Sequence, residues 1–426
     1  MAPTRTVLVL GGGGREHALC WALDRAPSVT AVHCAPGNAG VGQVATCHSE
    51  VDASDGDAVV RLAADLGADL VVVGPEAPLV AGVSDALDAA DVAVFGPSAA
   101  AARIEGSKQF AKQIMTAAGV PTARYWSGDD PEAAVAALDD FAPPYVVKAD
   151  GLAAGKGVRI CAERSEAEIA IEETMIAGLF GDAGNVVVLE EFLTGPEVSI
   201  FALCDGATCR LLAPAQDFKR AFDHDEGPNT GGMGAWSPYP VDDALVEALC
   251  AGVFQPVLDE LAQRGVPYTG VLYGGFMLTP AGPQVLEFNA RFGDPETQVV
   301  LPRLRSDLGE LLTACAAGRL ADAPPLIWDE RSCVTVVLAS GGYPGSYQTG
   351  RRIAGLDVAA QHGDALVFHA GTARKGDATV TAGGRVVGVS GLGVDVSSAR
   401  AAAYAAADKI SFDGLHRRND IAARVG

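Results

Sequence analysis

Three polar side chains at alternate positions, Glu287, Asn289 and Arg291, form the first grouping in the sequence that suggests chemistry. Alternate residues of a β-strand share one face, so these three would point the same way. The residues of the opposite face are apolar and belong in a core: Leu286, Phe288 and Ala290. Residues two apart on a strand lie roughly 6.5 Å apart, so the Glu287 carboxylate and the Asn289 amide oxygen can reach one hard cation. With phosphate oxygens and water, this ligand set is typical of magnesium; a merely solvated edge strand is the alternative.

Two lysines and a glycine-rich loop lie upstream at positions suited to phosphate binding. Lys108 begins a predicted helix, and Lys148 ends a predicted strand that runs straight into the loop 151–157. The loop is not a Walker A motif, because Gly157 stands where Ser or Thr must offer a hydroxyl to magnesium. We interpret it as a phosphate-covering flap of another class; a solvated Lys/Gly loop is the alternative. The flap residues expected to contact phosphate are Gly151, Gly155, Lys156 and Gly157.

An apolar strand predicted over 186–189 leads into a linker with acidic residues. The linker consists of Glu190, Glu191, Phe192 and Leu193. Its backbone can bind adenine, and Glu197, which follows seven residues after Glu190, can hold ribose hydroxyls. Alone this pattern would be weak. It gains weight from its position between the flap and the Glu-x-Asn strand.

The amino-terminal segment is predicted to form an anion site. A strand over 5–10 runs into four glycines and then a helix, so backbone amides and the helix amino terminus point at a bound group. The dinucleotide fingerprint Gly-x-Gly-x-x-Gly fails, because Glu16 and His17 stand where glycine is required. We therefore predict a site for a mononucleotide-like sugar phosphate, with a plain tight turn as the alternative. The expected contacts are Gly13, Gly14, Arg15, Glu16, Pro36, Gly37 and Asn38.

Further helix and strand signals alternate along the next segment, with strands over 70–73 and 92–95. The loops leave the carboxyl ends of predicted parallel strands, where open α/β sheets bind their ligands. The first of these loops contains Gly74, Pro75 and Glu76, and Glu76 can hold ribose hydroxyls. A structural turn is the alternative.

A long glycine-rich segment follows Lys219 and is expected to close over substrate, because long loops in compact domains are usually functional or disordered. The expected substrate contacts are Lys219 itself and Asn229, Thr230, Gly231, Gly232 and Met233 of the loop. A scaffold helix is predicted over 242–264, and strands over 269–278 and 284–289 form a hairpin. The part after Pro325 is predicted to be a separable, mostly β tail that ends in a helix over 396–409, with no visible catalytic constellation.

Composition limits the possible partners. Thirty-one basic against 53 acidic residues give a net charge of −22, which argues against general nucleic-acid or anionic-membrane binding. A protein this acidic must supply amides, chosen lysines and arginines, or metal ions wherever it binds phosphate. The nine cysteines include no Cys-x-x-Cys pair, which is typical of reduced thiols. No apolar run approaches the roughly 18 residues of a membrane span, so we expect a cytoplasmic protein.

Taken together, the lysines, the flap, the linker, Glu197 and Glu287-x-Asn289 resemble the ATP-grasp ligases. The segment 291–298, Arg-Phe-Gly-Asp-Pro-Glu-Thr-Gln, is similar to the signature of the phosphoribosylamine–glycine ligase family. The stretches GGGGREHA, APGNAG, NTGGMG and GYPG are similar to the same family, and the resemblance covers essentially the whole chain. One departure concerns the strand 273–278, which carries no acid where many ATP-grasp enzymes have a further metal carboxylate.

The resemblance implies an α/β and α+β multidomain protein. Its expected parts are an amino-terminal open parallel α/β sheet for the ribosyl phosphate (1–102), the ATP-grasp lid and first part of the ATP-binding region (103–190), the main ATP-grasp subdomain with the metal site (191–327), and a mostly β domain that completes the nucleotide cleft (328–426).

The resemblance also implies a reaction: ATP, glycine and 5-phosphoribosylamine give ADP, phosphate and glycinamide ribonucleotide through glycyl phosphate, in purine biosynthesis. Mg²⁺ or Mn²⁺ would be held by Glu287 and Asn289, with Lys148, Arg291 and Asp294 as catalytic residues and Gly293 beside the substrate. Asp294 is the candidate for holding the glycine ammonium group. A monomer or weak dimer with small-molecule substrates and no nucleic-acid or membrane partner is expected.

Three other functions compete with this hypothesis. Another ATP-grasp ligase of purine biosynthesis would use a different carboxylate, such as formate or bicarbonate. An oxidoreductase built on the glycine-rich opening is disfavoured by the broken dinucleotide fingerprint. A nucleotide sensor without catalysis is disfavoured by the full set of lysines and metal ligands.

Overall fold

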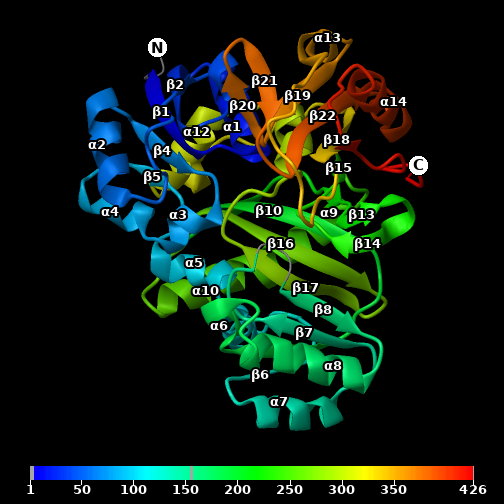
Figure 1. Cartoon of the computed structure of the whole chain (residues 1–426). Coiled ribbons are helices and arrows are strands. Elements are labelled where there is room, and N and C mark those ends of the chain that lie inside the picture. The colour runs from blue at the N-terminus through cyan, green and yellow to red at the C-terminus, as the bar shows by residue number, and fades with distance from the viewer. Residues whose placement is uncertain (1–3, 154–156, 426) are drawn as a thin grey trace.

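The chain forms three lobes around a central sheet (Figure 1). The computed structural model describes residues 4–153 and 157–425. The amino-terminal and carboxyl-terminal parts lie side by side at the top of Figure 1, with a smaller lobe at the bottom. Among the described residues, no helix has the length and apolar character needed to cross a membrane.

The amino-terminal lobe is a five-stranded parallel sheet in the order β3-β2-β1-β4-β5. Its strands are β1 (Arg5–Gly11), β2 (Val29–Pro36), β3 (Thr46–Cys47), β4 (Leu70–Val73) and β5 (Val94–Phe95). The helices are α1 (Gly14–Asp24), α2 (Gly56–Leu66), α3 (Glu76–Val80), α4 (Val83–Ala89) and α5 (Ala99–Gly106). The apolar runs of β1 and β4 are buried, as expected for parallel strands covered on both faces. The strand predicted over 92–95 is shorter than expected. The turn before it ends at Asp91, whose φ is positive, at 56°.

The bottom lobe is an antiparallel sheet of four strands in the order β6-β9-β7-β8. These are β6 (Tyr125–Gly128), β7 (Tyr145–Ala149), β8 (Val158–Cys161) and β9 (Val187–Glu191). The helices α7 (Pro131–Ala137) and α8 (Arg164–Ile171) pack on this sheet and bury its own small core. The helix α6 (Lys108–Ala117) begins at Ser107, whose hydroxyl caps it by accepting the backbone N–H of Phe110.

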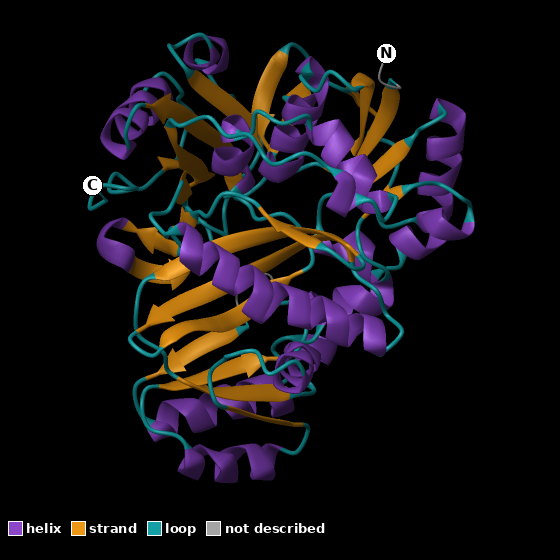
Figure 2. Cartoon of the chain, turned by 180° about the vertical axis from the view of Figure 1, so that it is seen from behind, coloured by secondary structure: helices purple, strands orange, loops and turns teal. Residues whose placement is uncertain are grey.

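The central sheet is antiparallel, in the order β11-β10-β16-β17. Its strands are β10 (Glu197–Asp205), β11 (Cys209–Leu211), β16 (Thr269–Thr279) and β17 (Gly282–Asn289). The predicted helix over 242–264 is present as α9 (Asp243–Leu249), a π-helical turn η6 (Cys250–Phe254) and α10 (Gln255–Gln263). Figure 2 shows this long helix crossing the back of the central sheet.

A β-bulge interrupts the alternation predicted for β17. The pairing with β16 shifts between Gly275 and Phe276, so that Glu287 pairs with Gly275 whereas Val285 pairs with Phe276. Val285, together with Phe288 and Ala290, lies in the largest core cluster, whereas Leu286 is only half-buried. The expectation that Leu286 shares the core face is therefore wrong, because a bulge directs two successive side chains to one side of a sheet.

The carboxyl-terminal sheet crosses the boundary that the sequence suggested. Its six strands include two from the ATP-grasp region, and the order is β12-β15-β18-β22-β19 with β23 also paired to β18. The strands are β12 (Gln216–Asp217), β15 (Gly234–Ser237), β18 (Ser332–Ser340), β19 (Ala365–His369), β22 (Arg385–Gly393) and β23 (Leu415–His416). The tail after Pro325 is thus not separable, because β15 and β18 share backbone hydrogen bonds.

Smaller elements complete the upper half of the molecule. The helices are α11 (Thr297–Val300), α12 (Leu308–Ala316), α13 (Leu356–Ala360) and α14 (Val396–Ala407), the last capped by Asp395. Two hairpins pair β13 (Arg220–Phe222) with β14 (Glu226–Asn229) and β20 (Thr372–Lys375) with β21 (Ala378–Thr381).

A core substitution tests the packing of the long helix against the central sheet. Phe276 is fully buried, and its ring centroid lies 5.9 Å from that of Phe254 on the helix. Phe276→Ala should lower the free energy of unfolding by about 3–5 kcal/mol, because it removes apolar contacts and leaves a cavity. Urea denaturation followed by circular dichroism measures this loss. Phe222→Ala is the matched control, since Phe222 is 48% exposed; an equal loss in both variants would contradict the assigned core.

Candidate active site

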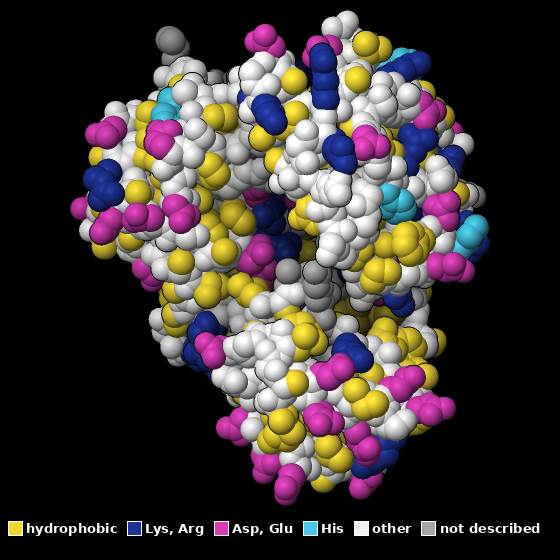
Figure 3. Space-filling view, viewed as in Figure 1, with side chains coloured by type: hydrophobic (Ala, Val, Ile, Leu, Met, Phe, Trp, Pro, Cys, Tyr) yellow, Lys and Arg dark blue, Asp and Glu magenta, His cyan; other side chains and the backbone are white. Residues whose placement is uncertain are grey.

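The ammonium group of Lys148 connects two sheets at the mouth of a cleft. Lys148 lies on β7 of the bottom lobe, and its Nζ is 2.8 Å from Glu190 Oε2 on the neighbouring strand β9. The same Nζ donates across the cleft to the carbonyl oxygen of Leu286 at 3.3 Å, beside the bulge of β17. Figure 3 shows a recess between the upper lobes and the bottom lobe in which basic and acidic side chains are visible.

A second buried lysine, Lys112, supports this arrangement and was not identified from the sequence. Its Nζ lies 3.1 Å from Glu190 Oε1 and donates to Thr122 Oγ1 at 2.7 Å. Burial lowers the pKa of Lys112 to about 8. The Glu190 carboxylate is thus shared by two lysines, and its side chain, at 3% exposure, is engaged within the protein. Lys112 follows Lys108 by one helical turn, but that spacing alone is equally typical of a solvated helix face.

Lys108 lies at the start of α6 and contacts the flap. Its Nζ donates to the carbonyl oxygen of Gly151 at 3.2 Å, and burial lowers its pKa. Gly157 is the last residue of the flap, and its carbonyl oxygen accepts the backbone N–H of Ala149. The predicted flap residues Gly155 and Lys156 lie outside the described residues.

The linker after β9 runs along the cleft. The carboxylate of Glu191 accepts the backbone N–H of Arg124 at 2.8 Å. The side chain of Phe192 is 39% exposed, and Leu193 is half-buried. An exposed aromatic ring suits contact with a flat ligand ring.

Glu287 and Asn289 lie next to each other and next to the lysines, as predicted. Asn289 Nδ2 donates to Glu287 Oε1 at 3.5 Å. Burial alone would raise the pKa of Glu287, but Lys148, Lys219 and Lys108 together lower it below the usual value. Within residues 4–153 and 157–425, no three His, Cys, Asp or Glu side chains are grouped as a metal site. One ionised carboxylate and one amide nevertheless fit a magnesium ion that takes its other ligands from phosphate and water.

Lys219 and Glu197 form an ion pair close to this strand. Lys219 Nζ lies 2.6 Å from Glu197 Oε2 and 2.8 Å from Asp217 Oδ1. Deeper in the structure, Tyr273 donates its hydroxyl to Glu296 at 3.0 Å, and burial raises the pKa of Glu296 to about 7. Sequence reasoning did not identify Glu296 as a functional candidate, although it lies within the acidic turn that follows Arg291.

Arg291 joins the central sheet to the amino-terminal lobe. Its guanidinium lies 3.1 Å from Glu105 and 3.3 Å from Glu76. Arg291 also donates to Asn289 Oδ1 at 3.3 Å, which couples it to the candidate metal pair. Burial raises the pKa of Glu105, whereas Arg291 lowers that of Glu76 against the opposite effect of burial. Glu105 was missed, because an acid within a predicted helix carries no local signal for an ion pair formed 186 positions later in the chain.

Asp294 lies where the amino-terminal glycine turn, the segment around Gln298 and the carboxyl-terminal sheet meet. Arg385 of the carboxyl-terminal sheet lies 3.1 Å from one carboxylate oxygen, and Gln298 donates to the other at 2.7 Å. A Cβ added to Gly13 or Gly14 would come within 3.5 or 3.6 Å of the same carboxylate. Although burial would raise the pKa of Asp294, Arg385 and Arg15 hold it below the usual value.

The tail, in which the sequence shows no catalytic constellation, contributes Arg385 to the surroundings of Asp294. Its guanidinium also donates to the carbonyl oxygen of Asp294 at 2.6 Å and to that of Gly231. It thereby links the tail to two predicted substrate segments. No spacing or motif in the sequence identifies this arginine, because its partners belong to other lobes.

The amino-terminal glycine turn is held in place by the side chains of neighbouring residues. Glu16 accepts the backbone N–H of Gly13 at 2.6 Å and lies 2.5 Å from Arg15 Nε. Arg15 Nη1 also donates to the carbonyl oxygen of Phe292 at 3.0 Å. The Asn38 amide donates to the carbonyl of Gly12 at 2.9 Å, and its oxygen accepts from two backbone amides. The side chains of Arg15, Glu16 and Asn38 thus shape the loop from within.

The loops at the carboxyl ends of β1, β2 and β4 open onto a cavity of about 540 Å³. Its lining includes the predicted residues Pro36 and Pro75, with Gly11 between them. Gly11 has no room for a side chain. Its φ is positive, at 120°, and a Cβ added there would lie 2.6 Å from Glu16 and 2.9 Å from Pro75. Gly37 and Gly74 lie in the same loops.

The glycine-rich loop after β14 is firmly anchored. The backbone N–H groups of Thr230 and Met233 donate to the carbonyl oxygens of Lys219 and Phe218, and both side chains are buried. At Gly232, φ is 107°, and an added Cβ would lie 2.4 Å from Pro295. The loop thus packs against the acidic turn of the signature segment, while Asn229 ends the hairpin β13–β14.

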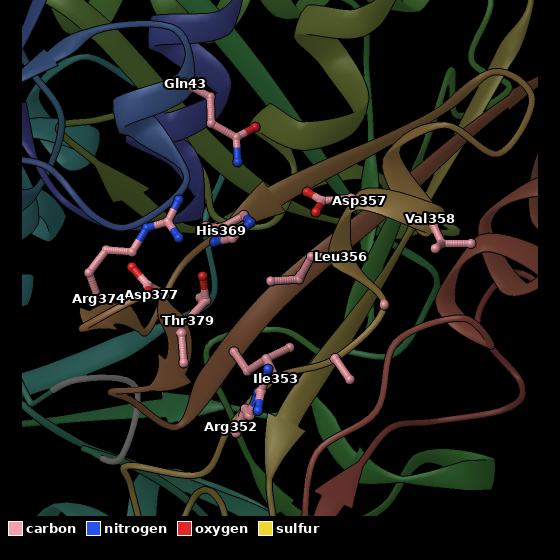
Figure 4. Close-up of a pocket in the computed structure, with 13 residues that line it drawn as sticks. Gln43, Arg352, Ile353, Leu356, Asp357, Val358, His369, Arg374, Asp377 and Thr379 are labelled. Carbon is pink, nitrogen blue, oxygen red and sulfur yellow. The ribbon is translucent and has the colours of Figure 1, made fainter.

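A further surface pocket of about 420 Å³ is lined in part by His369, whose carbonyl oxygen accepts a hydrogen bond from Asn38 at 2.8 Å. Figure 4 shows Gln43 of the amino-terminal lobe together with His369 and Arg374 of the carboxyl-terminal lobe. None of the residues predicted as functional lines it.

Comparison with known proteins agrees with this architecture. Models of the phosphoribosylglycinamide synthetase N domain, ATP-grasp (A) domain and C domain match residues 5–105, 106–297 and 333–424. A phosphoribosylamine–glycine ligase of Streptomyces coelicolor is 56% identical over 98% of this chain and 99% of its own length. One of Caulobacter vibrioides is 49% identical over 99% and 98% of the two chains.

Solved structures show the same fold. The crystal structure of phosphoribosylamine–glycine ligase from Thermotoga maritima has a TM-score of 0.84 and 34% identity, covering 98% of this chain and all of that one. The biotin carboxylase domain of 2-oxoglutarate carboxylase from Hydrogenobacter thermophilus, crystallised with MgADP, has a TM-score of 0.74 at 16% identity, over 98% and 92% of the two chains. The resemblance and the fold class expected from the sequence are confirmed. The chain belongs to the phosphoribosylamine–glycine ligase family, the ATP-grasp ligases of purine biosynthesis that these matches define.

Proposed function

We propose that this chain converts the carboxylate of glycine into glycyl phosphate and transfers the glycyl group to 5-phosphoribosylamine. A free carboxylate is a poor acyl donor, because oxide would have to leave. In the first step a glycine oxygen bonds to the γ-phosphorus of ATP, and the bond from that phosphorus to ADP breaks. In the second step the sugar amine attacks the carbonyl carbon, inorganic phosphate leaves and the nitrogen loses a proton. The juxtaposition of Lys148 with the Glu287–Asn289 pair across the cleft carries the proposal.

The nucleotide binds between the bottom lobe and the central sheet. Lys108 and Lys148 neutralise its phosphates, since phosphoryl transfer depends mainly on positioning and charge compensation. The linker contributes backbone contacts and the exposed ring of Phe192 for the base, and Glu197 contributes a carboxylate for the ribose. We assign to the flap, of which Gly151 and Gly157 are described, the exclusion of water that protects an acyl phosphate from hydrolysis.

ATP-grasp enzymes generally use a divalent metal ion together with ATP. Glu287 and Asn289 would hold Mg²⁺ or Mn²⁺, and the ion would supply neutralisation of the charge on the nucleotide phosphates. Arg291 approaches the same pair through Asn289 and stabilises the oxygens that gain charge during transfer.

The sugar amine binds on the side of the amino-terminal lobe. Backbone amides of the glycine turn, with Arg15, suit its phosphate, because they gather at the amino terminus of α1. Asp294 adjoins this turn and carries a full negative charge, which suits the ammonium group of glycine. The loop 229–233 closes the other side of the site through its contact with Pro295 and Arg385.

The substrate requirement is tested by measuring ADP formation with each substrate omitted in turn. We expect rapid ADP formation only when ATP, glycine, phosphoribosylamine and Mg²⁺ are all present. Without the amine, ADP should form much more slowly or not at all. Stimulation by formate or bicarbonate in place of glycine would assign the chain to another carboxylate and overturn the proposal.

The metal role is tested by Glu287→Gln. The amide keeps the shape but loses the charge that holds the cation, so turnover should fall by roughly 100-fold and recover partly at high Mg²⁺. Steady-state assays over a range of Mg²⁺ concentrations measure this, with Glu226→Gln, at an exposed position, as the matched control. The thermal midpoint should stay close to that of the wild type. Full activity at low Mg²⁺ would contradict the assignment.

The ion pair between lobes is tested by Arg385→Ala. Without the guanidinium, the pKa of Asp294 rises, because the strongest interaction that lowers it is lost while burial still raises it. We expect KM for glycine to rise roughly 10-fold and the acidic limb of the pH–rate profile to move to higher pH. Arg385→Lys should restore part of both. Arg351→Ala, which removes an exposed ion pair of the same lobe, is the control; identical profiles for both alanine variants would refute the role.

A further inference from the structure

Two cysteines face each other on the back of the central sheet, far from the cleft. Cys209 lies on the edge strand β11, and Cys250 begins the π-helical turn η6 of the long helix. Their sulfur atoms are 3.1 Å apart. The strand β17, which carries the candidate metal pair, forms the opposite edge of this four-stranded sheet. The proposed reaction does not use either thiol.

The approach of the two thiols is fixed by their surroundings. Leu249, Val253 and Phe254 bury the helix against the sheet, and Cys209 packs at the edge of the same core. Gln255 also donates from the helix to the carbonyl oxygen of Ala207, at 2.8 Å, in the turn before β11. The π-helical turn makes the helix locally wider at Cys250, and such turns are frequent at functional sites.

These two cysteines are also less buried than most cysteines of the chain. All nine cysteines lie within the described residues, and six of them are buried. Cys47, Cys209 and Cys250 are half-buried, and only the last two have sulfurs in hydrogen-bonding contact with each other. The hydrogen bond between the two sulfurs lowers the pKa of Cys250 and raises that of Cys209. A thiolate is the reactive form of cysteine.

We propose that Cys209 and Cys250 form a dithiol site that low-molecular-weight disulfides oxidise reversibly to an intrachain disulfide. The Cys250 thiolate attacks one sulfur of the small disulfide, so that a mixed disulfide forms and one small thiolate leaves. The Cys209 thiol then gives its proton to solvent, and its sulfur attacks Cys250 Sγ and expels the second small thiolate. The two protein thiols lose two electrons in total, and the small disulfide is reduced to two thiols.

The bond would attach the long helix covalently to the edge of the central sheet. It closes a loop between positions 41 residues apart, which restricts the unfolded chain. The oxidised protein should therefore unfold at a temperature a few degrees higher than the reduced protein. The bond lies at the edge of the sheet opposite β17. We therefore expect it to change the stability of the helix and this sheet edge rather than the binding of phosphates.

The test uses the full chain treated with oxidised glutathione under native conditions. Tryptic mass spectrometry should find the peptides of Cys209 and Cys250 linked, with two hydrogen masses lost, and dithiothreitol should reverse the link and the rise in the thermal midpoint. Cys209→Ser and Cys250→Ser should abolish both effects. Cys47→Ser, at the remaining half-buried cysteine, should retain them.

Three results would overturn the proposal. One is a link that forms only after the chain is unfolded in urea. Another is stable glutathione adducts at single cysteines, or a link among Cys20, Cys34 and Cys47 instead. The third is a quantitative link between Cys209 and Cys250 with an unchanged thermal midpoint, which would show that it does not constrain the helix.

Discussion

The cleft depends on a single buried ammonium group that two sheets share. Lys148 pairs with Glu190 on its own sheet and donates to the Leu286 carbonyl on the other, so the distance between the sheets is set at the point where phosphate is expected. The bulge in β17 exposes that carbonyl and leaves Glu287 and Asn289 facing the same space. Removing a charge from water is costly unless it is paired, and the arrangement is stable because Glu190 compensates both Lys148 and Lys112.

The same rule organises the rest of the site in a protein with a net charge of −22. Several cations of the site pair with acids inside the protein: Arg291 with Glu105 and Glu76, Lys219 with Glu197, and Arg385 with Asp294. The pairs of Arg291 and Arg385 join parts of the molecule that are far apart in the sequence. Positive charge is thereby held in fixed positions around the cleft despite the acidic composition, which suits the binding of anionic substrates.

Much of this organisation could be predicted from local patterns. Strand β4 has the predicted bounds, and the segments around Lys148 and Glu287 form the expected elements, because buried runs and alternation are local signals. The bulge at Leu286 was missed, since it depends on pairing with Gly275 and Phe276. Lys112, Glu105 and Arg385 were missed for a related reason: each acts through a partner on another element, which no spacing reveals. The shared carboxyl-terminal sheet was missed for the same reason, because its strands come from both sides of Pro325.

The central claim is that this cleft joins the carboxylate of glycine to the γ-phosphoryl group of ATP before the sugar amine attacks. The most direct test uses glycine labelled with ¹⁸O in its carboxylate, with isotope analysis of the phosphate released during turnover. We predict that each phosphate carries one oxygen atom from glycine, because the bond to the carbonyl carbon breaks when the amine displaces phosphate. Phosphate free of the label, while glycinamide ribonucleotide forms at the normal rate, would contradict the account.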